Sequence, residues 1–395
     1  MSATLRAGYK QTEVGVIPED WDVSLFSEVF SITAGGDVDP KRSQSFQDDI
    51  HCYPIYSNAL TNNGHYGYCS YADHPAGSLT ITARGMVGSA NFRDHAYTAI
   101  GRVLVLQPKN DIAGIYFAET VNNRVKFANE STGVPQLTAP QISKYLLPVP
   151  PLPEQQAIAD ALSDADALIE SLEQLVAKKR HLKQGTMQEL LTGKKRLPGF
   201  SGEWAEKRLG ELAEMGSGGT PLSSVSEYYD GDIPWVSISD MTKGGKVIES
   251  TERNLTALGF ANSAAQMFPT DSVLYAMYAS LGECSIAGVS LCASQAILGI
   301  RVKSNLSSEF LYYYLTSLKP IVKSIGQQGT QSNLNKGMVQ DFRISLPPVA
   351  EQTAIATILS DMDAEIAELE TQLAKTRALK QGMMHKLLTG EIRLP

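Results

Sequence analysis

The sequence predicts an α+β protein in which two globular domains with mainly antiparallel sheets are joined by two long helices that form an antiparallel coiled coil, with pseudo-two-fold symmetry. Three observations lead to this fold class. A segment of 45 residues that begins at Glu154 returns at Glu351 with 28 identities. Acidic and basic residues are separated along both copies, as an antiparallel coiled coil requires. Short β-rich runs precede each copy in a matching order.

Each copy of the repeat has the signals of one long helix. Prolines stand just before it, and a Thr-Gly step followed by a proline stands at its end. Between these signals, apolar residues recur at spacings of four and three, with Ala165 and Met362 continuing the pattern, which predicts a coiled-coil seam. The seam consists of Ile158, Leu162, Ile169, Leu172 and Val176 in the first copy and Ile355, Leu359, Ile366, Leu369 and Leu373 in the second.

The charges predict how the two helices pair. Residues 154–173 carry six acids and no base, and residues 178–196 carry seven bases and one acid. The second copy repeats this asymmetry, with six acids in 351–370 and five bases with one acid in 375–393. An antiparallel pair places each acidic half beside a basic half, and acids at the N-terminal ends also suit the helix dipoles. About 40 residues at roughly 1.5 Å each predict a spacer on the order of 60 Å long.

Four segments follow from this organisation. They are residues 1–149, the first globular domain with an N-terminal lead-in at 1–20; 150–198, the central helix; 199–346, the second globular domain; and 347–395, the C-terminal helix. The lead-in to Trp21 resembles the linker to Trp204. Because the second helix stops where the first enters that linker, joining the chain ends is expected to give two equivalent halves.

The two globular regions share a predicted strand skeleton. The matched pairs are Gly35-Gly36 with Gly218-Gly219, 53–57 with 233–237, 79–82 with 273–276, and 103–106 with 297–300. A helix is expected after each skeleton, around 112–127 and 308–325. The loops between the matched strands differ, which indicates one task performed on two different targets.

Composition narrows the class of protein. With 43% hydrophobic and 19% charged residues and no apolar run near the roughly 18 to 20 residues of a membrane span, a cytoplasmic protein without membrane association is expected. The four cysteines show no zinc-binding spacing, so no metal site is predicted. A net charge of -8 argues against a broad basic surface that grips nucleic acid unaided.

The repeated motifs resemble those of a known family. Pro-Pro-Leu-Pro-Glu-Gln at 150–155, Pro-Pro-Val-Ala-Glu-Gln at 347–352, and Leu-Leu-Thr-Gly at both helix ends are similar to the specificity subunit of type I restriction-modification enzymes. The resemblance covers the whole chain. It implies that the two globular domains, 1–149 and 199–346, are target recognition domains, each of which reads one part of a split, asymmetric site in double-stranded DNA. Two methyltransferase (modification) subunits would dock, and restriction/translocase subunits would complete the assembly. S-adenosylmethionine, ATP and Mg are expected on those partners, and no cofactor on this chain.

Candidate base-reading residues are those whose side chains match base edges. Arg and Lys pair with guanine, and Asn and Gln pair with adenine. The DNA-binding candidates are Lys41, Arg42, Asn62, Arg84, Asn91, Arg93 and Gln136 in the first domain and Lys243, Lys246, Arg253, Gln331 and Asn333 in the second. For each of them, a solvated surface residue is the alternative interpretation.

Catalytic motifs are missing from the sequence. We find no Asn-Pro-Pro-Tyr type methyltransferase motif and no phosphate-binding loop, so the chain is expected to be a non-catalytic subunit. The alternatives are a coiled-coil scaffold protein and the specificity subunit of a methylation-only or type IIB-like system. Gly185 and Gly382 lie inside the predicted helices at a cost of about 1 kcal/mol each, which suggests close packing of the two helices or a kink.

Overall fold

The computed structural model describes residues 6–101, 103–128, 133–328 and 333–394. Its contacts divide the chain into two units, the first being Met1–Glu173 with Thr371–Pro395 and the second Gln174–Glu370. Both divisions fall inside the long helices. Each half of a long helix therefore belongs with the globular region on which it packs, whereas the sequence-based segments begin a new part at each helix start.

The first unit contains two sheets and two short strand pairs. Its strands are β1 (Tyr9–Thr12), β2 (Gly15–Pro18), β3 (Asp22–Leu25), β4 (Phe30–Ala34), β5 (Ser43–Gln44), β6 (Tyr53–Tyr56), β7 (His65–Cys69), β8 (Ser78–Thr82), β9 (Ala90–Arg93), β10 (Thr98–Ala99), β11 (Val103–Pro108) and β12 (Leu146–Val149). Its short helices are α1 (Phe26–Val29), η1 (Pro40–Arg42), η2 (Thr61–Gly64), α2 (Gly114–Arg124) and α3 (Ala139–Ile142).

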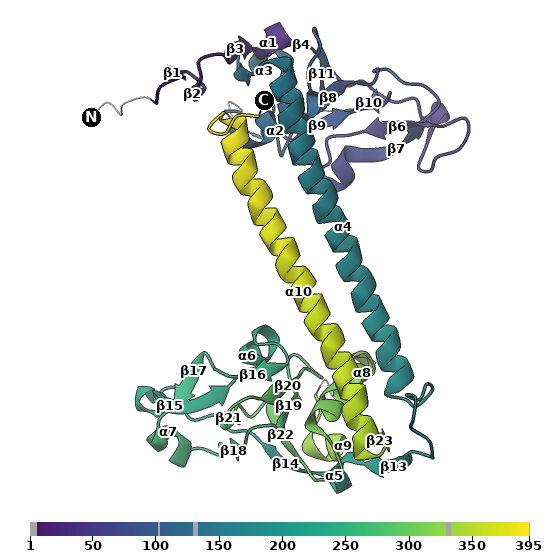
Figure 1. Cartoon of the computed structure of the whole chain (residues 1–395), viewed down its shortest axis with the longest axis vertical. Coiled ribbons are helices and arrows are strands. Elements are labelled where there is room, and N and C mark those ends of the chain that lie inside the picture. The colour runs from purple at the N-terminus through teal and green to yellow at the C-terminus, as the bar shows by residue number, and fades with distance from the viewer. Residues whose placement is uncertain (1–5, 102, 129–132, 329–332, 395) are drawn as a thin grey trace. The chain divides into compact units, whose positions relative to one another are not determined.

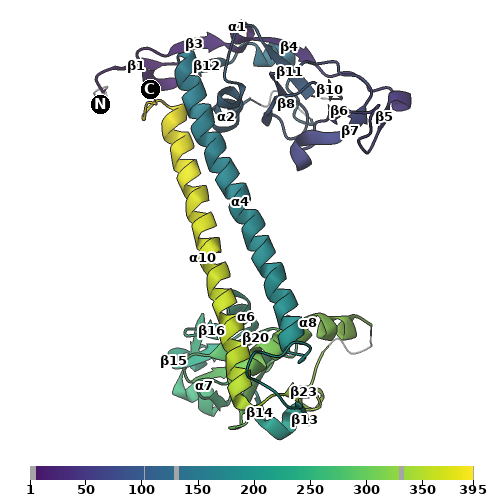
Figure 2. The same ribbon diagram turned by 45° about the vertical axis from the view of Figure 1, so that its right-hand side comes forward.

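The order of the larger sheet in the first unit is β4-β11-β8-β9, and all its neighbours are antiparallel. Helix α2 packs against β8 and β9 and covers a core that includes Phe30, Tyr116 and Phe117, each 1% exposed or less. A second sheet, β10-β6-β7-β5, lies farther from the start of the long helix (Figures 1 and 2). Only β10 and β6 pair in parallel there.

The second unit repeats this plan with other lengths. Its strands are β13 (Ala205–Arg208), β14 (Ala213–Ser217), β15 (Tyr229–Val236), β16 (Val247–Ile248), β17 (Arg253–Leu255), β18 (Met267–Phe268), β19 (Val273–Ala276), β20 (Cys284–Ala287), β21 (Leu291–Ala293), β22 (Ile297–Val302) and β23 (Arg343–Leu346). Its helices besides the long ones are α5 (Leu209–Leu212), η3 (Ser226–Tyr228), α6 (Ile238–Lys243), α7 (Ala257–Ala261), α8 (Ser308–Gln328) and α9 (Lys336–Gln340).

The sheets of the second unit have the orders β14-β22-β19-β20-β16 and β17-β15-β21-β18. Strands β19 and β22 pair antiparallel as β8 and β11 do, and α8 packs on β19 and β20 as α2 packs on β8 and β9. Most neighbours are antiparallel, with parallel pairs only at β15 with β21 and β16 with β20 among the described strands. The predicted fold class, including its duplicated skeleton, is confirmed.

The two long helices are α4 (Leu152–Leu190) and α10 (Val349–Leu388), each drawn without a break in Figure 1. In the first unit, Lys380 pairs with Asp166 at 2.6 Å and Arg377 with Glu173 at 2.5 Å. In the second unit, Arg180 pairs with Glu370 at 2.6 Å and Lys179 with Glu365 at 2.5 Å. Within each unit, later residues of one helix meet earlier residues of the other, so the predicted antiparallel pairing is confirmed.

The seam residues are buried to different degrees. Those of the first unit nearest the helix start, Ile158 and Leu162, are fully buried in its core together with Leu387 and Leu388. Ile355 and Leu359 take the corresponding place in the core of the second unit. Leu172, Val176 and Ile366 are also buried, whereas Ile169, Leu369 and Leu373 are half-buried. The seam is thus most protected where each helix enters a globular core.

A Trp-Glu-Arg clamp fixes the start of each long helix. In the first unit, Glu154 accepts hydrogen bonds from Trp21 Nε1 at 2.8 Å and from Nε and Nη2 of Arg393 at 2.6 and 2.8 Å. In the second, Glu351 accepts from Trp204 Nε1 at 3.1 Å and from Nε and Nη2 of Arg196, both at 2.7 Å. Bidentate Arg-carboxylate contacts of this kind are strong and directional.

The neighbouring motif residues complete the clamp. Gln155 and Gln352, 3% and 0% exposed, bind the backbone before α2 and α8 through Ala113 N at 3.1 Å and Ser307 N at 2.8 Å. Gly390 adopts a φ of 70°, and a Cβ there would meet Pro18 and Trp21 at 2.5 and 3.2 Å. The repeated Glu-Gln and Thr-Gly steps are therefore explained by contacts within each unit.

Within the ranges that the structure describes, no helix combines the length and the apolar character needed to cross a membrane.

Candidate nucleic-acid interface

Three segments of the first unit meet in what we call the first-unit loop cluster, residues 57–64, 83–88 and 133–138. Leu137 N donates to Ala83 O at 2.8 Å, and Gly85 N donates to Pro135 O at 2.8 Å. Through these bonds Arg84 and Gln136 form an antiparallel β-bridge. The cluster thereby holds three predicted residues, Asn62, Arg84 and Gln136, all exposed.

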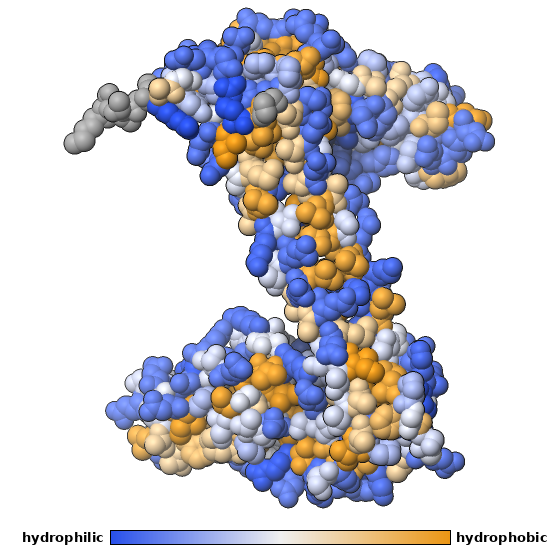
Figure 3. Space-filling view, in the orientation of Figure 1, coloured by the Kyte–Doolittle hydropathy of each residue, from blue (hydrophilic) through white to orange (hydrophobic). Residues whose placement is uncertain are grey.

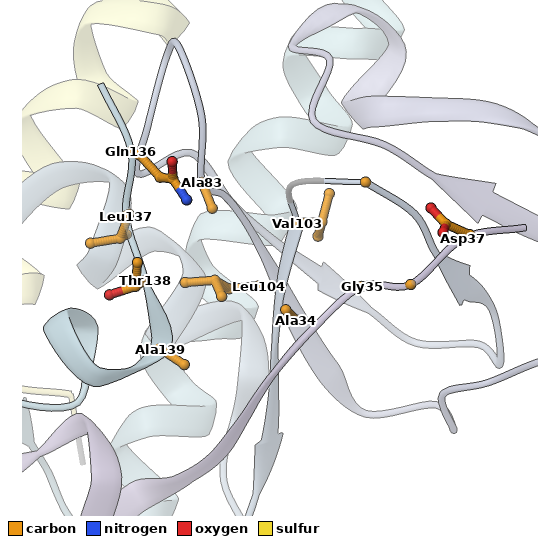
Figure 4. A pocket seen from close by; sticks show the side chains of 12 residues that line it. Ala34, Gly35, Asp37, Ala83, Val103, Leu104, Gln136, Leu137, Thr138 and Ala139 are labelled. Carbon is orange, nitrogen blue, oxygen red and sulfur yellow. The ribbon is translucent and has the colours of Figure 1, made fainter. Parts of the chain in front are cut away.

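A pocket of about 430 Å³ opens beside this cluster. Its lining includes Gln136, Thr138, Asp37 and the apolar side chains of Val103 and Leu104. Figure 4 shows Gln136 next to Ala83 on one side of the pocket and Asp37 on the other. An amide, a hydroxyl and a carboxylate at one opening supply both donors and acceptors, the groups that base edges require.

Arg93 lies inside the domain and does not join this exposed set. Its side chain is 5% exposed, and its Nη2 donates to Asn63 O at 2.7 Å while its Nε donates to Thr80 Oγ1 at 3.0 Å. The guanidinium lies 3.5 Å from the centre of the Tyr56 ring, and burial lowers its pKa. We therefore assign Arg93 to the support of the 61–64 turn. Asn91, two positions earlier on the same strand β9, is half-buried.

Lys41 and Arg42 are exposed on the single turn η1. The Arg42 guanidinium lies 4.2 Å from the centre of the Tyr71 ring and donates through Nε to Ser70 Oγ at 3.2 Å. Stacking on an aromatic ring holds the guanidinium while leaving other donors facing solvent. Both residues are available for contact with DNA phosphates.

The second unit has a counterpart of the loop cluster with different side chains. Leu334 N donates to Met277 O at 3.0 Å, the same contact that Leu137 N makes with Ala83 O. It places Asn333 and Tyr278 where the first unit has Gln136 and Arg84. Asn333 is exposed and Tyr278 is 36% exposed.

Tyr278 was missed by sequence reasoning. The matched strands 79–82 and 273–276 carry the signal, since the offset of 194 between them leads from Arg84 to Tyr278. Gln331 lies outside the described residues.

The basic candidates of the second unit occupy different environments. Lys243 is exposed and bonded to Glu252 at 2.6 Å, and that hydrogen bond raises its pKa. Arg253 is also exposed, with its guanidinium 4.1 Å from the centre of the Tyr229 ring. Lys246 instead contacts Glu309 of α8 at 3.0 Å and Ser360 of α10 at 3.1 Å. Lys246 is therefore engaged within the unit, whereas Lys243 and Arg253 face solvent.

A second surface lies on the long helices. A groove on α4 is lined by Ala177, Lys178, His181, Leu182, Gly185, Thr186 and other residues of that helix. Leu182 is 50% exposed, and its counterpart Leu379 on α10 is 64% exposed. Apart from the backbone of its own helix, a Cβ built on Gly185 or on Gly382 would meet no atom of the described residues within 4 Å. The expected close packing of the two helices at these glycines is thus wrong, because none of the residues that the structure describes fills the space beside them.

The chain is similar to known proteins along most of its length. The family model described as "Type I restriction modification DNA specificity domain" matches residues 18–178 and 201–376. The putative type I restriction enzyme MjaX specificity subunit of Methanocaldococcus jannaschii is 24% identical over 98% of this chain and 97% of its own length. The EcoR124I/EcoR124II specificity subunit of Escherichia coli is also 24% identical, over 45% of each chain.

Solved structures share the fold. The S subunit of a type I restriction-modification system from M. genitalium aligns with a TM-score of 0.63 over 98% of both chains, at 14% identity. A chain from a structural study of complex assembly and conformational transition in a type I system aligns with a TM-score of 0.57 over 95% of this chain and 99% of its own length, at 19% identity. The two family matches fall on the two halves of the repeat. Together with the shared fold, they establish that this chain belongs to the family of type I restriction-modification DNA specificity proteins.

Proposed function

We propose that this chain is the sequence-specific DNA-binding subunit of a type I restriction-modification system, and that each unit reads one part of a split, asymmetric target. One observation carries this proposal: the same backbone contact presents Arg84 and Gln136 in the first unit but Tyr278 and Asn333 in the second. An unchanged framework with unlike exposed side chains is what two different half-sites require.

The chemistry of the two sets fits base recognition in the major groove. Arg84 offers a planar fork of donors that suits the two acceptors of guanine, and Gln136 or Asn333 can pair with the donor and acceptor of adenine. Tyr278 offers a ring for apolar contact and a hydroxyl for a hydrogen bond. The exposed cations Lys41 and Lys243 would hold phosphates, which positions a domain without specifying sequence.

The groove on α4 supports docking of partner subunits on the long helices. Leu182, Gly185 and Lys178 recur as Leu379, Gly382 and Lys375 on α10, and all six are exposed. A helical glycine costs about 1 kcal/mol relative to alanine. An exposed glycine that no internal contact requires, present twice beside an exposed leucine, is explained by a partner helix that packs closely over each site.

The partners that fit are two methyltransferase subunits. Identical side chains in the two copies favour two copies of one partner segment, and Lys178 and Lys375 favour an amphipathic helix with acidic residues at its edge. Apolar side chains reach the surface of the long helices on the face shown in Figure 3. We further propose that restriction/translocase subunits join through this assembly in the cytoplasm.

This chain is proposed to be non-catalytic. S-adenosylmethionine would supply the methyl group on the methyltransferase subunits, and ATP with Mg would act on the translocase subunits. The described residues here contribute binding and orientation of DNA. No group of three or more His, Cys, Asp and Glu side chains among them gathers in a way that could hold a metal ion.

Methylation mapping tests the DNA-reading proposal. The chain is co-expressed with its methyltransferase subunits, and methylated sites are determined by sequencing. Replacing residues 21–149 by the corresponding region of another family member is expected to change one part of the split target and leave the other part intact. A replacement that changes both parts, or neither, would contradict separate reading by the two units.

A stoichiometry measurement tests the docking surface. Leu182→Ser and Leu379→Ser are each expected to leave one methyltransferase subunit bound per chain in native mass spectrometry, and the double variant none. Both leucines are at least half exposed, so the fold is expected to be retained. Gln184→Ala, on the same turn but outside the groove lining, is the control. Full binding by the double variant would place the docking surface elsewhere.

A further inference from the structure

We propose that Asn58 is a positioning residue for target recognition, acting through the backbone of Arg84 in the first unit. The proposal rests on the DNA-reading function above. Asn58 follows strand β6, carries a half-buried side chain and stands at the start of the loop that contains Asn62. We assign it no contact with bases, because both polar atoms of its amide form hydrogen bonds within the protein.

Both ends of the Asn58 amide bind the segment that carries Arg84. Its Oδ1 accepts from Ala83 N at 2.6 Å and from Arg84 N at 3.3 Å. Its Nδ2 donates to Arg84 O. The side chain thus satisfies the donor and the acceptor of the Arg84 backbone, as a neighbouring strand would in a sheet.

The Asn58 contacts join the segment 57–64 to the segment 83–88 of the loop cluster. On its other side, Arg84 is held by the isolated bridge to Gln136, supported by Gly85 N donating to Pro135 O. Beyond residue 84 the chain turns through Gly85, whose φ is 78°. Without Asn58, the loop 57–64 and the turn at Arg84 would keep their own strands but lose their mutual register.

The far end of the same loop is anchored independently. Arg93 donates to Asn63 O at 2.7 Å, and Ser57 N donates to Gly64 O at 2.7 Å. Loss of the Asn58 contacts is therefore expected to release Arg84 without unfolding the loop. This separates a positioning role from a structural one.

The second unit provides the internal comparison. The residue that corresponds to Asn58 is Ile238, the first residue of α6, whose side chain has no hydrogen-bonding group. Ser237 instead accepts from Asp240 N and caps that helix. The second unit has no equivalent side chain at this position, so removal of the Asn58 contacts should leave base recognition by the second unit unchanged.

Asn58→Asp is the sharpest variant. It keeps the shape and the acceptor toward Ala83 N, but it replaces the donor by a carboxylate oxygen that faces the Arg84 carbonyl. Two like acceptors repel, so the contact opens. Asn58→Ala removes the contact without adding charge. Thr61→Ala, in the same loop and exposed, is the matched control.

The experiment uses the full chain assembled with its methyltransferase subunits. Binding is measured to the duplex target found by methylation mapping and to two duplexes that carry single base-pair changes in one part of the target or the other. Asn58→Asp and Asn58→Ala are expected to reduce discrimination in the part read by the first unit by at least about 10-fold, while discrimination in the other part and the thermal unfolding midpoint stay at the wild-type values.

The outcomes separate the inference from the proposed function. Wild-type discrimination by both variants would overturn the inference, as would an equal loss in both parts of the target together with a lowered unfolding midpoint. A wild-type complex that discriminates in neither part would instead contradict the DNA-reading function itself.

Discussion

The Trp-Glu-Arg clamp and the loop cluster both occur in each unit, but the clamp has the same residue types in the two units and the loop cluster does not. The clamp keeps identical residue types, with Trp21, Glu154 and Arg393 in one unit and their counterparts in the other. The loop cluster keeps one backbone contact and changes the exposed side chains around it. A single exchange among the side chains that satisfy a buried carboxylate leaves the charge unpaired, whereas side chains that meet an outside target are free to differ.

Breaking a clamp is the largest effect expected. Arg393→Met removes the guanidinium from the 5%-exposed Glu154 carboxylate and leaves it, among the described donors, with Trp21 Nε1, and the free energy of unfolding is expected to fall by about 3 kcal/mol. This is the lower end of the usual range, because Arg393 is itself 39% exposed. Denaturant unfolding followed by tryptophan fluorescence measures the loss.

The second clamp provides the comparison. Arg196→Met is expected to destabilise in the same direction, since Glu351 is fully buried. Adding Glu154→Gln to Arg393→Met should restore much of the stability by removing the unpaired charge. Unfolding curves unchanged by either Arg variant would show that the shared motif has a role other than holding the helix start.

Arg84→Ala tests the variable side of the comparison. It is expected to reduce discrimination at one base pair by about 1–3 kcal/mol, measured by competition binding with single-base variants of the target. Tyr278→Ala should affect a base pair in the other part of the target. A uniform loss of affinity across all variants would identify Arg84 as a phosphate contact.

On the long helices, one substitution is expected to stabilise the isolated chain and to weaken its binding to the partner subunit. Gly185→Ala is expected to raise the unfolding free energy of the isolated chain by about 1 kcal/mol, because alanine is the better helix former and its Cβ meets nothing. The same change should weaken binding of the methyltransferase subunit, as measured by calorimetry. Gly382→Ala is expected to behave alike, and tighter binding by either variant would exclude close packing of a partner there.

The smallest effect is expected at Lys246. Because it bonds to Glu309 and Ser360 within the second unit, Lys246→Met should lower stability by about 1 kcal/mol or less. Base discrimination should not change, since the side chain is held inside the unit. A loss of discrimination at one base pair, with stability unchanged, would restore Lys246 as a base-reading candidate.

The arrangement of distant segments was predictable where the same motif occurs twice in the sequence. The helices, their direction and the shared skeleton follow from segregated charge and from motifs present twice, as the pairs Lys380–Asp166 and Arg180–Glu370 confirm. The orientation of single cations was not predictable. Arg93 and Lys246 turn inward because of partners at distant positions, Tyr56 for one and Ser360 for the other, which composition does not reveal.

Two further features needed the structure. The role of Asn58 depends on the backbone of Arg84, 26 residues away, and an asparagine after a strand normally suggests only a turn. The glycines of the long helices were visible in the sequence, but the geometry around Gly185 and Gly382 was needed to show that no contact among the described residues accounts for them.

The clamps also bear on synthesis. Arg196 and Trp204 lie eight positions apart, whereas Trp21 and Arg393 come from distant parts of the chain. The second unit uses only residues up to Glu370, and the first needs residues from Thr371 onward. On the ribosome, the second unit can therefore close its core before the first, although most of the first is made earlier. Until Arg393 has been synthesised, the Glu154 carboxylate lacks the guanidinium that pairs with it in the folded unit. The first unit therefore completes its folding last, although its synthesis begins first.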